Sequence, residues 1–326
     1  MQAGTANSRL VLRCIQDICK KSKNAPQTRF RSGKMVIAAT GFFDGVHLGH
    51  RAVLNSLVET ARKMGGHSLV LSFWPHPRAV LQKDAQRFRL LTSLDEKKEM
   101  IRKLGVDDFQ IIPFTRDFSS LTSSVFFRDY LHTRYGVKVL IAGYDHRLGC
   151  DGVRDPEKMD KEARMSGIEI IRVPEYVSEQ GEHISSTKIR AALSEGSIET
   201  ANRWLGYPYC LHGVVVEGNR IGKTLGFPTA NMQLYEPLKQ LPANGVYKVE
   251  ARLNGKWYKG MMNIGFRPTV APNLEHTIET HIFDFDDNIY GLEIRVRILK
   301  YHRQEIAFPS LDSLKEQLHK DKQALL

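Results

Sequence analysis

The chain has 326 residues, of which 42% are hydrophobic and 25% are charged. This composition is typical of a globular protein, and the length predicts one to three domains with substantial cores. No stretch approaches the ~20 apolar residues needed to span a membrane, so the sequence argues against a membrane protein. Four scattered cysteines without paired ligand spacing indicate free thiols in a reducing compartment, and we expect a cytoplasmic protein.

The positive charge is concentrated at the N-terminus. Residues 1–34 carry eight basic side chains and one acidic one, so +7 of the formal net charge of +11 belongs to this segment. The other 292 residues carry only +4 and lack the basic face of a duplex-binding protein, so we expect no nucleic-acid partner. We interpret residues 1–34 as a basic extension, with a mitochondrial transit peptide as the alternative.

Strand-like and helix-like runs alternate along residues 35–206. The strand-like runs are 35–39, 68–73, 109–113, 137–143 and 168–173, and the helix-like runs are about 48–64, 93–104, 122–135 and 156–166. This alternation predicts a first domain with a parallel, doubly wound, Rossmann-like sheet, whose ligands bind at the carboxyl ends of the strands. A further helix over 197–205 ends at Gly206, where we place the end of this domain.

A glycine-containing turn follows the first predicted strand and leads into the next helix. It reads Gly41-Phe42-Phe43-Asp44-Gly45-Val46-His47-Leu48-Gly49-His50. His47 and His50 are three positions apart and so share one face of the first helical turn. Backbone N–H groups at a helix start favour phosphate, and the imidazoles can stabilise charge that develops during phosphoryl or nucleotidyl transfer. Half of a metal site and ordinary surface residues are the alternatives for this pair.

Two loops at other strand ends carry candidate ligand-binding side chains. His76 lies in Trp74-Pro75-His76-Pro77, a rigid segment that a structural turn explains equally well. Asp145 lies in the glycine-bracketed loop 143–149, where it is suited to hold a hydroxyl or amide of a ligand. A solvated loop acid is the alternative for Asp145.

Hydroxyl and basic residues precede the helix-like run that begins near residue 190. Residues 185–190 read Ser-Ser-Thr-Lys-Ile-Arg. This pattern predicts either a simple N-cap or a second anion cradle, formed by Ser186, Thr187 and Arg190 among others. Two such cradles in one sheet would fit a triphosphate held at both ends.

From residue 207 onward the strand-like runs become short and are separated by turns. They are Tyr209–Val216, Gly245–Leu253, Lys256–Ile264, Thr277–Ile282 and Leu292–His302. Asn254-Gly255, between two of them, is the strongest hairpin signal in the chain. The pattern predicts a second domain over 207–326, a small antiparallel β-barrel followed by a helix at 310–323.

A glycine-rich stretch in this domain, residues 218–231, partly imitates a Walker A loop. Only three residues separate its first two glycines, and the Leu-Gly-Phe-Pro that follows cannot form the helix that a Walker A loop requires. Gly222 and Gly226 still permit a backbone nest for phosphate, and Thr229 and Asn231 offer oxygen ligands for Mg²⁺. A glycine-rich hairpin loop is the alternative.

Glu279 lies in an alternating strand-like segment, Ile278-Glu279-Thr280-His281-Ile282. If its face of the strand points into a site, Glu279 is a candidate general base. The alternative is the polar side of an ordinary strand. Just upstream, residues 263–269 read Asn-Ile-Gly-Phe-Arg-Pro-Thr and predict another rigid loop.

In their order along the chain, these motifs resemble those of the bacterial bifunctional riboflavin kinase/FAD synthetase family over about residues 35–326. The motifs that carry the resemblance are 41–50, 72–77, 91–92 with 96–97, 185–190, 226–231, 263–269 and Glu279. The resemblance implies that residues 207–326 phosphorylate riboflavin to FMN and that residues 35–206 adenylylate FMN to FAD with release of pyrophosphate. It also implies ATP as co-substrate, ADP as a product and Mg²⁺ as cofactor, and it leaves the oligomeric state open.

The resemblance implies roles for individual residues of the kinase. Glu279 would accept the proton of the riboflavin 5′-hydroxyl. Thr229 and Asn231 would bind Mg²⁺ and the ATP phosphates, and Gly222 and Gly226 would let the loop close over them.

The resemblance likewise implies roles in the adenylyltransferase, where His47 and His50 would stabilise charge on the ATP phosphates. The other implied ATP-binding residues are Gly41, Asp44, Ser186, Thr187 and Arg190. The implied flavin-binding residues are His76, Asp145 and Arg267.

One loop departs from the family pattern. Members usually carry Gly-x-Asp-Phe-x-Phe-Gly near the flavin, whereas residues 143–149 place His146 and Leu148 at the two aromatic positions. The departure leaves as an alternative a kinase whose N-terminal domain binds nucleotide or flavin without catalysis. A second alternative is an RNA-binding protein on a synthetase-like scaffold, which the nearly neutral body of the chain opposes.

Overall fold

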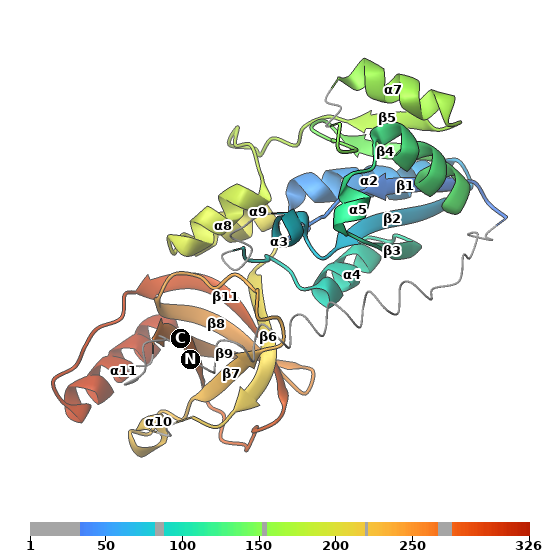
Figure 1. Cartoon of the computed structure of the whole chain (residues 1–326). Coiled ribbons are helices and arrows are strands. Elements are labelled where there is room, and N and C mark those ends of the chain that lie inside the picture. The colour runs from blue at the N-terminus through green and yellow to red at the C-terminus, as the bar shows by residue number, and fades with distance from the viewer. Residues whose placement is uncertain (1–32, 82–87, 152–154, 219–220, 267–275) are drawn as a thin grey trace. The chain divides into compact units, whose positions relative to one another are not determined.

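The computed structural model describes residues 33–81, 88–151, 155–218, 221–266 and 276–326. Contacts between residues divide it into two compact units, a sheet with helices and a barrel (Figure 1). Of the described residues, the first unit contains those up to Phe88 and those within Leu94–His183, and the second contains those within Arg89–Ser93 and Ile184–Leu326. Residues 1–32, most of the predicted basic extension, lie outside the described residues.

The first unit is built on five parallel strands in the order β3-β2-β1-β4-β5. They are β1 (Val36–Thr40), β2 (His67–Trp74), β3 (Asp108–Pro113), β4 (Val137–Gly143) and β5 (Glu169–Val173). The predicted parallel, doubly wound sheet is confirmed, and β1 lies between β2 and β4 at its centre. All residues of β1 are buried, because elements on both faces of the sheet cover them.

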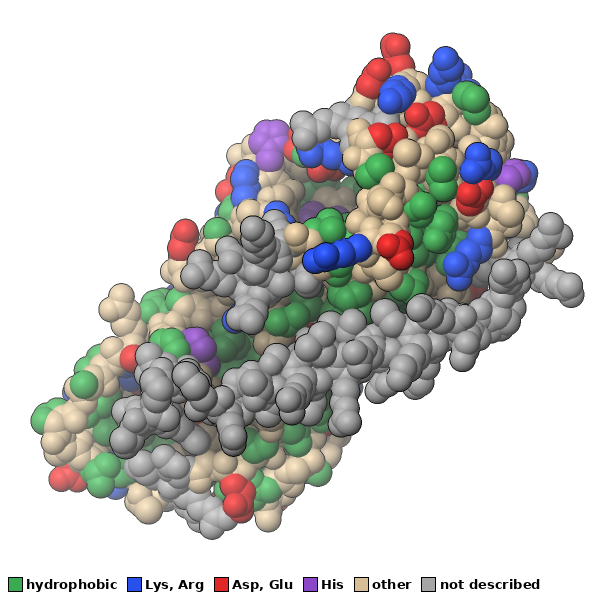
Figure 2. All heavy atoms as spheres, in the orientation of Figure 1, with side chains coloured by type: hydrophobic (Ala, Val, Ile, Leu, Met, Phe, Trp, Pro, Cys, Tyr) green, Lys and Arg blue, Asp and Glu red, His purple; other side chains and the backbone are tan. Residues whose placement is uncertain are grey.

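Helices cover both faces of this sheet. They are α2 (Leu48–Lys63), α3 (Pro77–Leu81), α4 (Leu94–Lys103), α5 (Arg116–Ser119), α6 (Ser123–Val125), η2 (Phe126–Arg134) and α7 (Pro156–Met165). Ile37 of β1 belongs to one apolar cluster with Leu57 of α2, whereas Ala38 belongs to a second cluster with Phe127 of η2. Successive strand residues point to opposite faces, so each face has its own core. Acidic and basic side chains are interspersed over the face of this unit that Figure 2 shows.

The second unit contains a closed antiparallel barrel with strand order β10-β7-β6-β11-β8-β9, which confirms the predicted barrel. Its strands are β6 (Tyr209–Val216), β7 (Ala230–Leu234), β8 (Gly245–Leu253), β9 (Lys256–Phe266), β10 (His276–Ile282) and β11 (Glu293–Arg303). Asn254 and Gly255 form the expected hairpin turn between β8 and β9, with φ of 47° and 83°. Strand β7 has no strand-like signal, because it begins inside the glycine-rich stretch, and it forms through pairing with β6 and β10.

Helices complete the described part of the second unit. They are α8 (Ser186–Ser194), α9 (Ile198–Leu205), α10 (Ile221–Thr224) and α11 (Leu311–Leu325). Ile189 of α8 and Leu205 of α9 belong to the same apolar cluster as Tyr209 and Tyr247 of the barrel. Contacts therefore place both helices with the barrel, whereas the sequence pattern groups them with the preceding domain. Helix α9 ends as predicted, because Gly206 adopts a φ of 74°.

The packing of α2 on the sheet can be tested with two residues of that helix. Leu57 is fully buried, whereas Asn55 is exposed. We expect Leu57→Ala to lower the free energy of unfolding of the first unit by about 2–5 kcal/mol, because it removes buried methyl groups and leaves a cavity. Asn55→Ala, the control, should change it by no more than about 0.5 kcal/mol. Equal effects of the two substitutions in urea unfolding would contradict this packing.

Candidate active sites

The turn between β1 and α2 is compact and largely buried. His47 is the N-cap of α2, and its side chain accepts a hydrogen bond from the backbone N–H of His50 at 3.3 Å. The turn requires positive φ angles, 84° at Gly45 and 38° at Val46. Glycine adopts such angles readily, whereas Val46 does so at a cost that the surrounding structure must offset. A fixed turn of this kind holds the histidine pair in one arrangement.

The imidazole rings of His47 and His50 stack, with centroids 3.6 Å apart, as expected for two side chains on one helical face. Nδ1 of His50 is buried and has no hydrogen-bond partner among the described residues. Burial, and then the charges of His47 and Lys97, hold the pKa of His50 well below its usual value. His50 is therefore neutral near pH 7 and carries an unsatisfied polar atom that suits a ligand group.

Lys97 of α4 is a second buried titratable group near this turn. Its side chain is 1% exposed, and Asp44 in the turn is 2% exposed. Burial lowers the pKa of Lys97, and the carboxylate of Asp44 opposes this shift. Perturbed, enclosed charges at a sheet edge are typical of functional positions. The sequence motif around Lys97 does not indicate this burial, because lysine on a helix normally lies in solvent.

The two residues expected near the flavin in this unit have different surroundings. His76 follows β2 and packs against Phe42 and Phe88, with ring centroids 4.8 and 4.3 Å from its own. Helix α3 begins directly after it at Pro77, so the rigid segment leads into a short helix. Asp145 is exposed in the loop after β4. Both residues follow strands that flank β1, where ligands of open sheets bind.

The two residues that depart from the family pattern each have a structural role. Nε2 of His146 lies 3.0 Å from Oγ1 of Thr40, the last residue of β1, and forms a hydrogen bond with it. Leu148 is 6% exposed and belongs to the same apolar cluster as Phe126. Burial lowers the pKa of His146 to about 4, so this imidazole is neutral. The loop is therefore anchored beside the turn after β1 by the very residues that replace the aromatic ones.

Ser186, Thr187 and Arg190 lie on α8 of the second unit, whereas the histidine pair lies in the first. The side chain of Ser185 caps α8 by accepting a hydrogen bond from the helix backbone at 3.3 Å, as the N-cap interpretation predicts. Nε of Arg190 donates to the carbonyl oxygen of Arg89 at 2.8 Å. Capping occupies one of several backbone N–H groups at a helix start, so it is compatible with an anion cradle.

A cavity of about 310 Å³ lies in the second unit and is lined by barrel strands and α11. Glu279 and its cross-strand partner Asn263 both line it. Strand β10 also pairs Glu279 with Asn231 of β7, and Oγ1 of Thr229 donates to Oε2 of Glu279 at 3.4 Å. Strand pairing and this hydrogen bond thus bring the candidate base and both candidate metal ligands together. Arg267 lies outside the described residues.

A second cavity, of about 340 Å³, shares Thr229 with the first. Its lining is more polar and includes Thr280, Asp286 and Asp287. Oγ1 of Thr280 is buried without a hydrogen-bond partner in the part of the chain that the structure describes. Two cavities that share a lining residue are suited to two substrates that exchange a group beside it. No sequence motif indicates the second cavity, because its lining comes from several separate segments.

Close neighbouring atoms, from a side chain in one case and from the backbone in the other, explain two glycines of the glycine-rich stretch. A Cβ atom on Gly218 would lie 2.1 Å from Nδ2 of Asn231, and one on Gly222 would lie 2.3 Å from the carbonyl oxygen of Phe227. Gly226 instead adopts a φ of 81°, which side chains rarely allow. The described part of the stretch, Gly218 and residues 221–231, is therefore folded tightly against the start of β7.

Two family models match the chain in the order of its two folds. The FAD synthetase model matches residues 30–188, and the riboflavin kinase model matches residues 205–326. The bifunctional riboflavin kinase/FMN adenylyltransferase of Listeria monocytogenes is 38% identical over 287 residues, which are 88% of this chain and 90% of that protein. The protein of the same name from Bacillus subtilis is 37% identical over 289 residues, again 88% of this chain and 90% of that protein.

A solved structure from Streptococcus pneumoniae, described as a macrolide-efflux protein, is 31% identical with a TM-score of 0.83 and covers 92% of this chain and 96% of that one. Among the residues described for the present chain, no helix is long and apolar enough to cross a membrane. A nucleotide-binding sheet joined to a kinase barrel defines a transferase with two centres. The chain belongs to the family of bifunctional riboflavin kinases/FMN adenylyltransferases.

The neutral state of His146 predicts how the stability of the first unit depends on pH. Its pKa is about 4 when folded and near 6.5 when unfolded, so between these values the unfolded chain binds more protons. As the pH falls from 6.5 towards 4, we expect the free energy of unfolding to fall by up to about 1.4 kcal/mol per pH unit. His146→Gln, which does not titrate, should show a shallower dependence in urea unfolding at several pH values. An unchanged slope would contradict a buried, neutral His146.

Proposed function

We propose that the second unit transfers the γ-phosphoryl group of ATP to riboflavin and that the first unit transfers the adenylyl group of ATP to FMN. One observation carries the kinase assignment: Thr229 lines both cavities and donates a hydrogen bond to Glu279. A phosphoryl donor in one cavity and a phosphoryl acceptor in the other would come together beside Thr229. Holding two reactants in alignment in this way supplies much of the catalysis of group transfer.

The chemistry of the two cavities favours one substrate for each. The first is largely apolar, with Met261, Leu314 and Leu318 in its lining, and suits the flat ring of a flavin. The second is more polar, with Asp286 and Asp287 at its wall, and suits the hydroxyl and amino groups of a nucleoside. We therefore assign riboflavin to the first cavity and ATP to the second.

Glu279 is the general base of the proposed kinase reaction. Its carboxylate accepts the proton of the riboflavin 5′-hydroxyl, the hydroxyl oxygen forms a bond to the γ-phosphorus, and the bond to ADP breaks. The hydrogen bond from Thr229 holds this carboxylate at the junction of the two cavities. Backbone N–H groups of the loop at Gly222 and Gly226 contribute to phosphate binding.

Thr229 and Asn231 have the chemistry of a magnesium site. Both carry hard oxygen atoms, and the side chain of Asn231, 8% exposed, occupies space that a Cβ atom on Gly218 would fill. We assign these two residues, with the phosphate oxygens of ATP, to hold Mg²⁺. When bound, the ion neutralises the charge of the phosphates.

In the first unit the phosphate of FMN is itself the nucleophile and needs no base from the protein. Its oxygen forms a bond to the α-phosphorus of ATP, and pyrophosphate leaves. His47 and the neutral His50 stabilise charge on the ATP phosphates. The proposal also includes Gly41 and Asp44, which shape the nucleotide pocket, and His76, Asp145 and Arg267, which bind flavin. Ser186, Thr187 and Arg190 on α8 of the second unit are proposed to bind phosphate groups.

A kinase with an inactive N-terminal domain is not favoured. The FAD synthetase family model matches residues 30–188. The histidine pair lies where the turn after β1 leads into α2, at the end of the sheet where ligands of open sheets bind. His146 and Leu148, the residues that suggested a loss of activity, stabilise the loop in which they lie.

Product analysis of the purified full chain with riboflavin, ATP and Mg²⁺ tests the proposal. We expect FMN to appear first and FAD to follow as FMN is consumed, and we expect chelation of Mg²⁺ by EDTA to stop riboflavin phosphorylation. FMN that accumulates without FAD would contradict the assignment of the first unit. Absence of both products would overturn the assignment of the second unit, and the first unit would then be tested with FMN supplied in place of riboflavin.

Glu279→Gln and His50→Gln should separate the two reactions. E279Q keeps the shape of the side chain but removes the proton acceptor, so the kinase kcat should fall by about 10²–10⁴-fold. H50Q should lower FMN adenylylation by at least about 10²-fold, since it replaces a group that stabilises developing charge. Each variant should retain the other reaction at the wild-type rate, which serves as its control. A parallel loss of both reactions in one variant would contradict two separate centres.

A further inference from the structure

A buried carboxylate on the C-terminal helix lies in the wall of the first cavity. Asp321 of α11 is 1% exposed and lines that cavity together with Arg303 of β11. Nε of Arg303 donates to both carboxylate oxygens at 3.0 and 3.1 Å, and Nη2 donates at 2.6 Å. Nε2 of Gln317 donates a hydrogen bond to Oδ1 of Asp321 at 2.8 Å, and Nε2 of His302 lies 3.3 Å from the same oxygen. Asp321 is therefore surrounded by donors, which would lose their acceptor without it.

Packing of α11 on the barrel does not by itself require this ion pair. Leu325 of α11 is 3% exposed and belongs to an apolar cluster with Val246 of β8 and Phe283, which follows β10. Leu318 of α11 packs against the same cluster. Burial of apolar surface of this kind already stabilises the docked helix. A buried ion pair adds little net stability, because desolvation of both charges offsets their attraction. The pair instead fixes one position of the helix relative to the strand.

Arg303 is connected to the candidate base through the chain segment that follows it and through one hydrogen bond. Two positions further along the chain, Oε1 of Glu305 accepts a hydrogen bond from Nδ2 of Asn263 at 3.0 Å. Asn263 is the cross-strand neighbour of Glu279 on β10. A displacement of Arg303 would therefore move Glu305, and with it the hydrogen bond to the strand beside Glu279.

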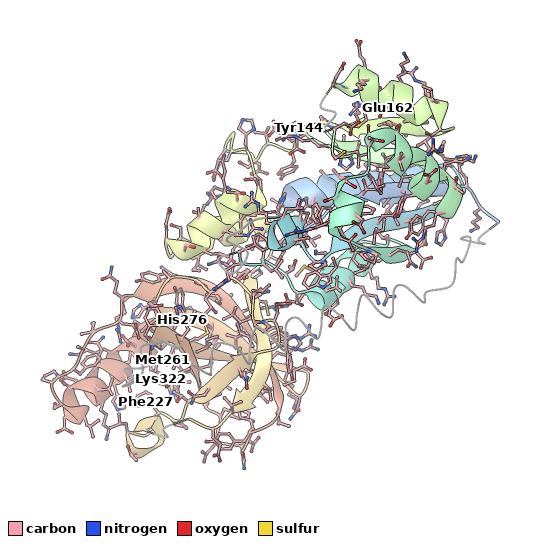
Figure 3. All side chains as sticks on the ribbon, in the orientation of Figure 1. Tyr144, Glu162, Phe227, Met261, His276 and Lys322 are labelled. Carbon is pink, nitrogen blue, oxygen red and sulfur yellow. The ribbon has the colours of Figure 1, made fainter. Side chains whose placement is uncertain are left out.

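Helix α11 also contacts the loop that precedes Thr229. The ring centroid of Phe227 is 4.8 Å from that of His319 on α11 and 5.1 Å from that of His281 on β10. Phe227 and Met261, which belong to the cluster that holds α11, are labelled beside this helix in Figure 3. Phe227 thus packs between α11 and the strand of the candidate base, two residues before Thr229.

We propose that Asp321 is a positioning residue of the kinase centre, which holds Arg303 and α11 in place and through them Glu279 and Thr229. This proposal rests on the assignment of riboflavin phosphorylation to the second unit. Asp321 reaches the reacting atoms only through other side chains, so its loss misplaces them and leaves the chemistry of the base intact. Its removal therefore affects how riboflavin binds and aligns.

Asp321→Asn in the full chain tests the proposal, with Glu316→Gln as matched control. Glu316 lies on the same helix in an exposed ion pair with Lys320, so E316Q also removes one carboxylate. We expect D321N to raise the KM for riboflavin at least about tenfold and to lower kinase kcat/KM by about 10²-fold, the scale of a small misplacement of reacting groups. E316Q should leave both within about twofold, as for an exposed ion pair. FMN adenylylation by the same preparations should not change.

The two possible roles of Asp321 give different kinetics. A merely structural role would lower the amount of folded kinase unit, and so the maximal rate, without changing the KM for riboflavin. An unchanged KM in folded D321N would overturn the proposal.

If D321N does not fold, His319→Ala tests the same coupling, because His319 is exposed and contacts Phe227 through its ring. We then expect the KM for ATP or riboflavin to rise at least about threefold, the scale of coupling through packed side chains, and unchanged values would overturn the proposal. A wild-type protein that does not phosphorylate riboflavin would refute the kinase assignment itself, which is a separate result.

Discussion

Strand pairing is the constraint on which both centres depend. In the barrel, β10 pairs with β7 on one side and β9 on the other, so Glu279 has Asn231 and Asn263 as cross-strand neighbours. Side chains alternate between the two faces of a strand, and a slip of one residue would turn Glu279 away from the cavity. Barrel closure opposes such a slip, because every strand is hydrogen-bonded on both sides.

Parallel pairing has the same effect in the first unit. Strand β1 is hydrogen-bonded to β2 and β4, so the loops after these three strands open at one edge of the sheet. The hydrogen bond between Thr40 and His146 ties two of those strand ends together. The turn after β1 holds unfavourable backbone conformations at Phe43 and Val46, since the sheet and α2 fix its two ends.

Both centres contain polar groups that stability alone would not place there. Nδ1 of His50 and Oγ1 of Thr280 are buried without a hydrogen-bond partner among the described residues, and Lys97 buries an ammonium group. Each such group raises the free energy of the folded protein. For His50 and Thr280, a bound substrate that supplies the missing hydrogen-bond partner recovers that free energy, which favours the ligand-bound state. The pair of Arg303 and Asp321 is the opposite case, because its charges are satisfied within the protein.

Local signals in the sequence determined much of the fold and, through the order of its motifs, the two reactions. The strand Val137–Gly143, the turn from β1 into α2 and the hairpin at Asn254-Gly255 follow from apolar periodicity, glycine conformation and capping, which neighbouring residues set. Only the tertiary structure decided that β7 is a strand, that Lys97 is buried, and that two cavities meet at Thr229. Thr229 and Glu279 are 50 positions apart. Such features arise from contacts between segments that are distant in the sequence. A local sequence pattern cannot predict them, because each segment acquires its environment only when the others fold against it.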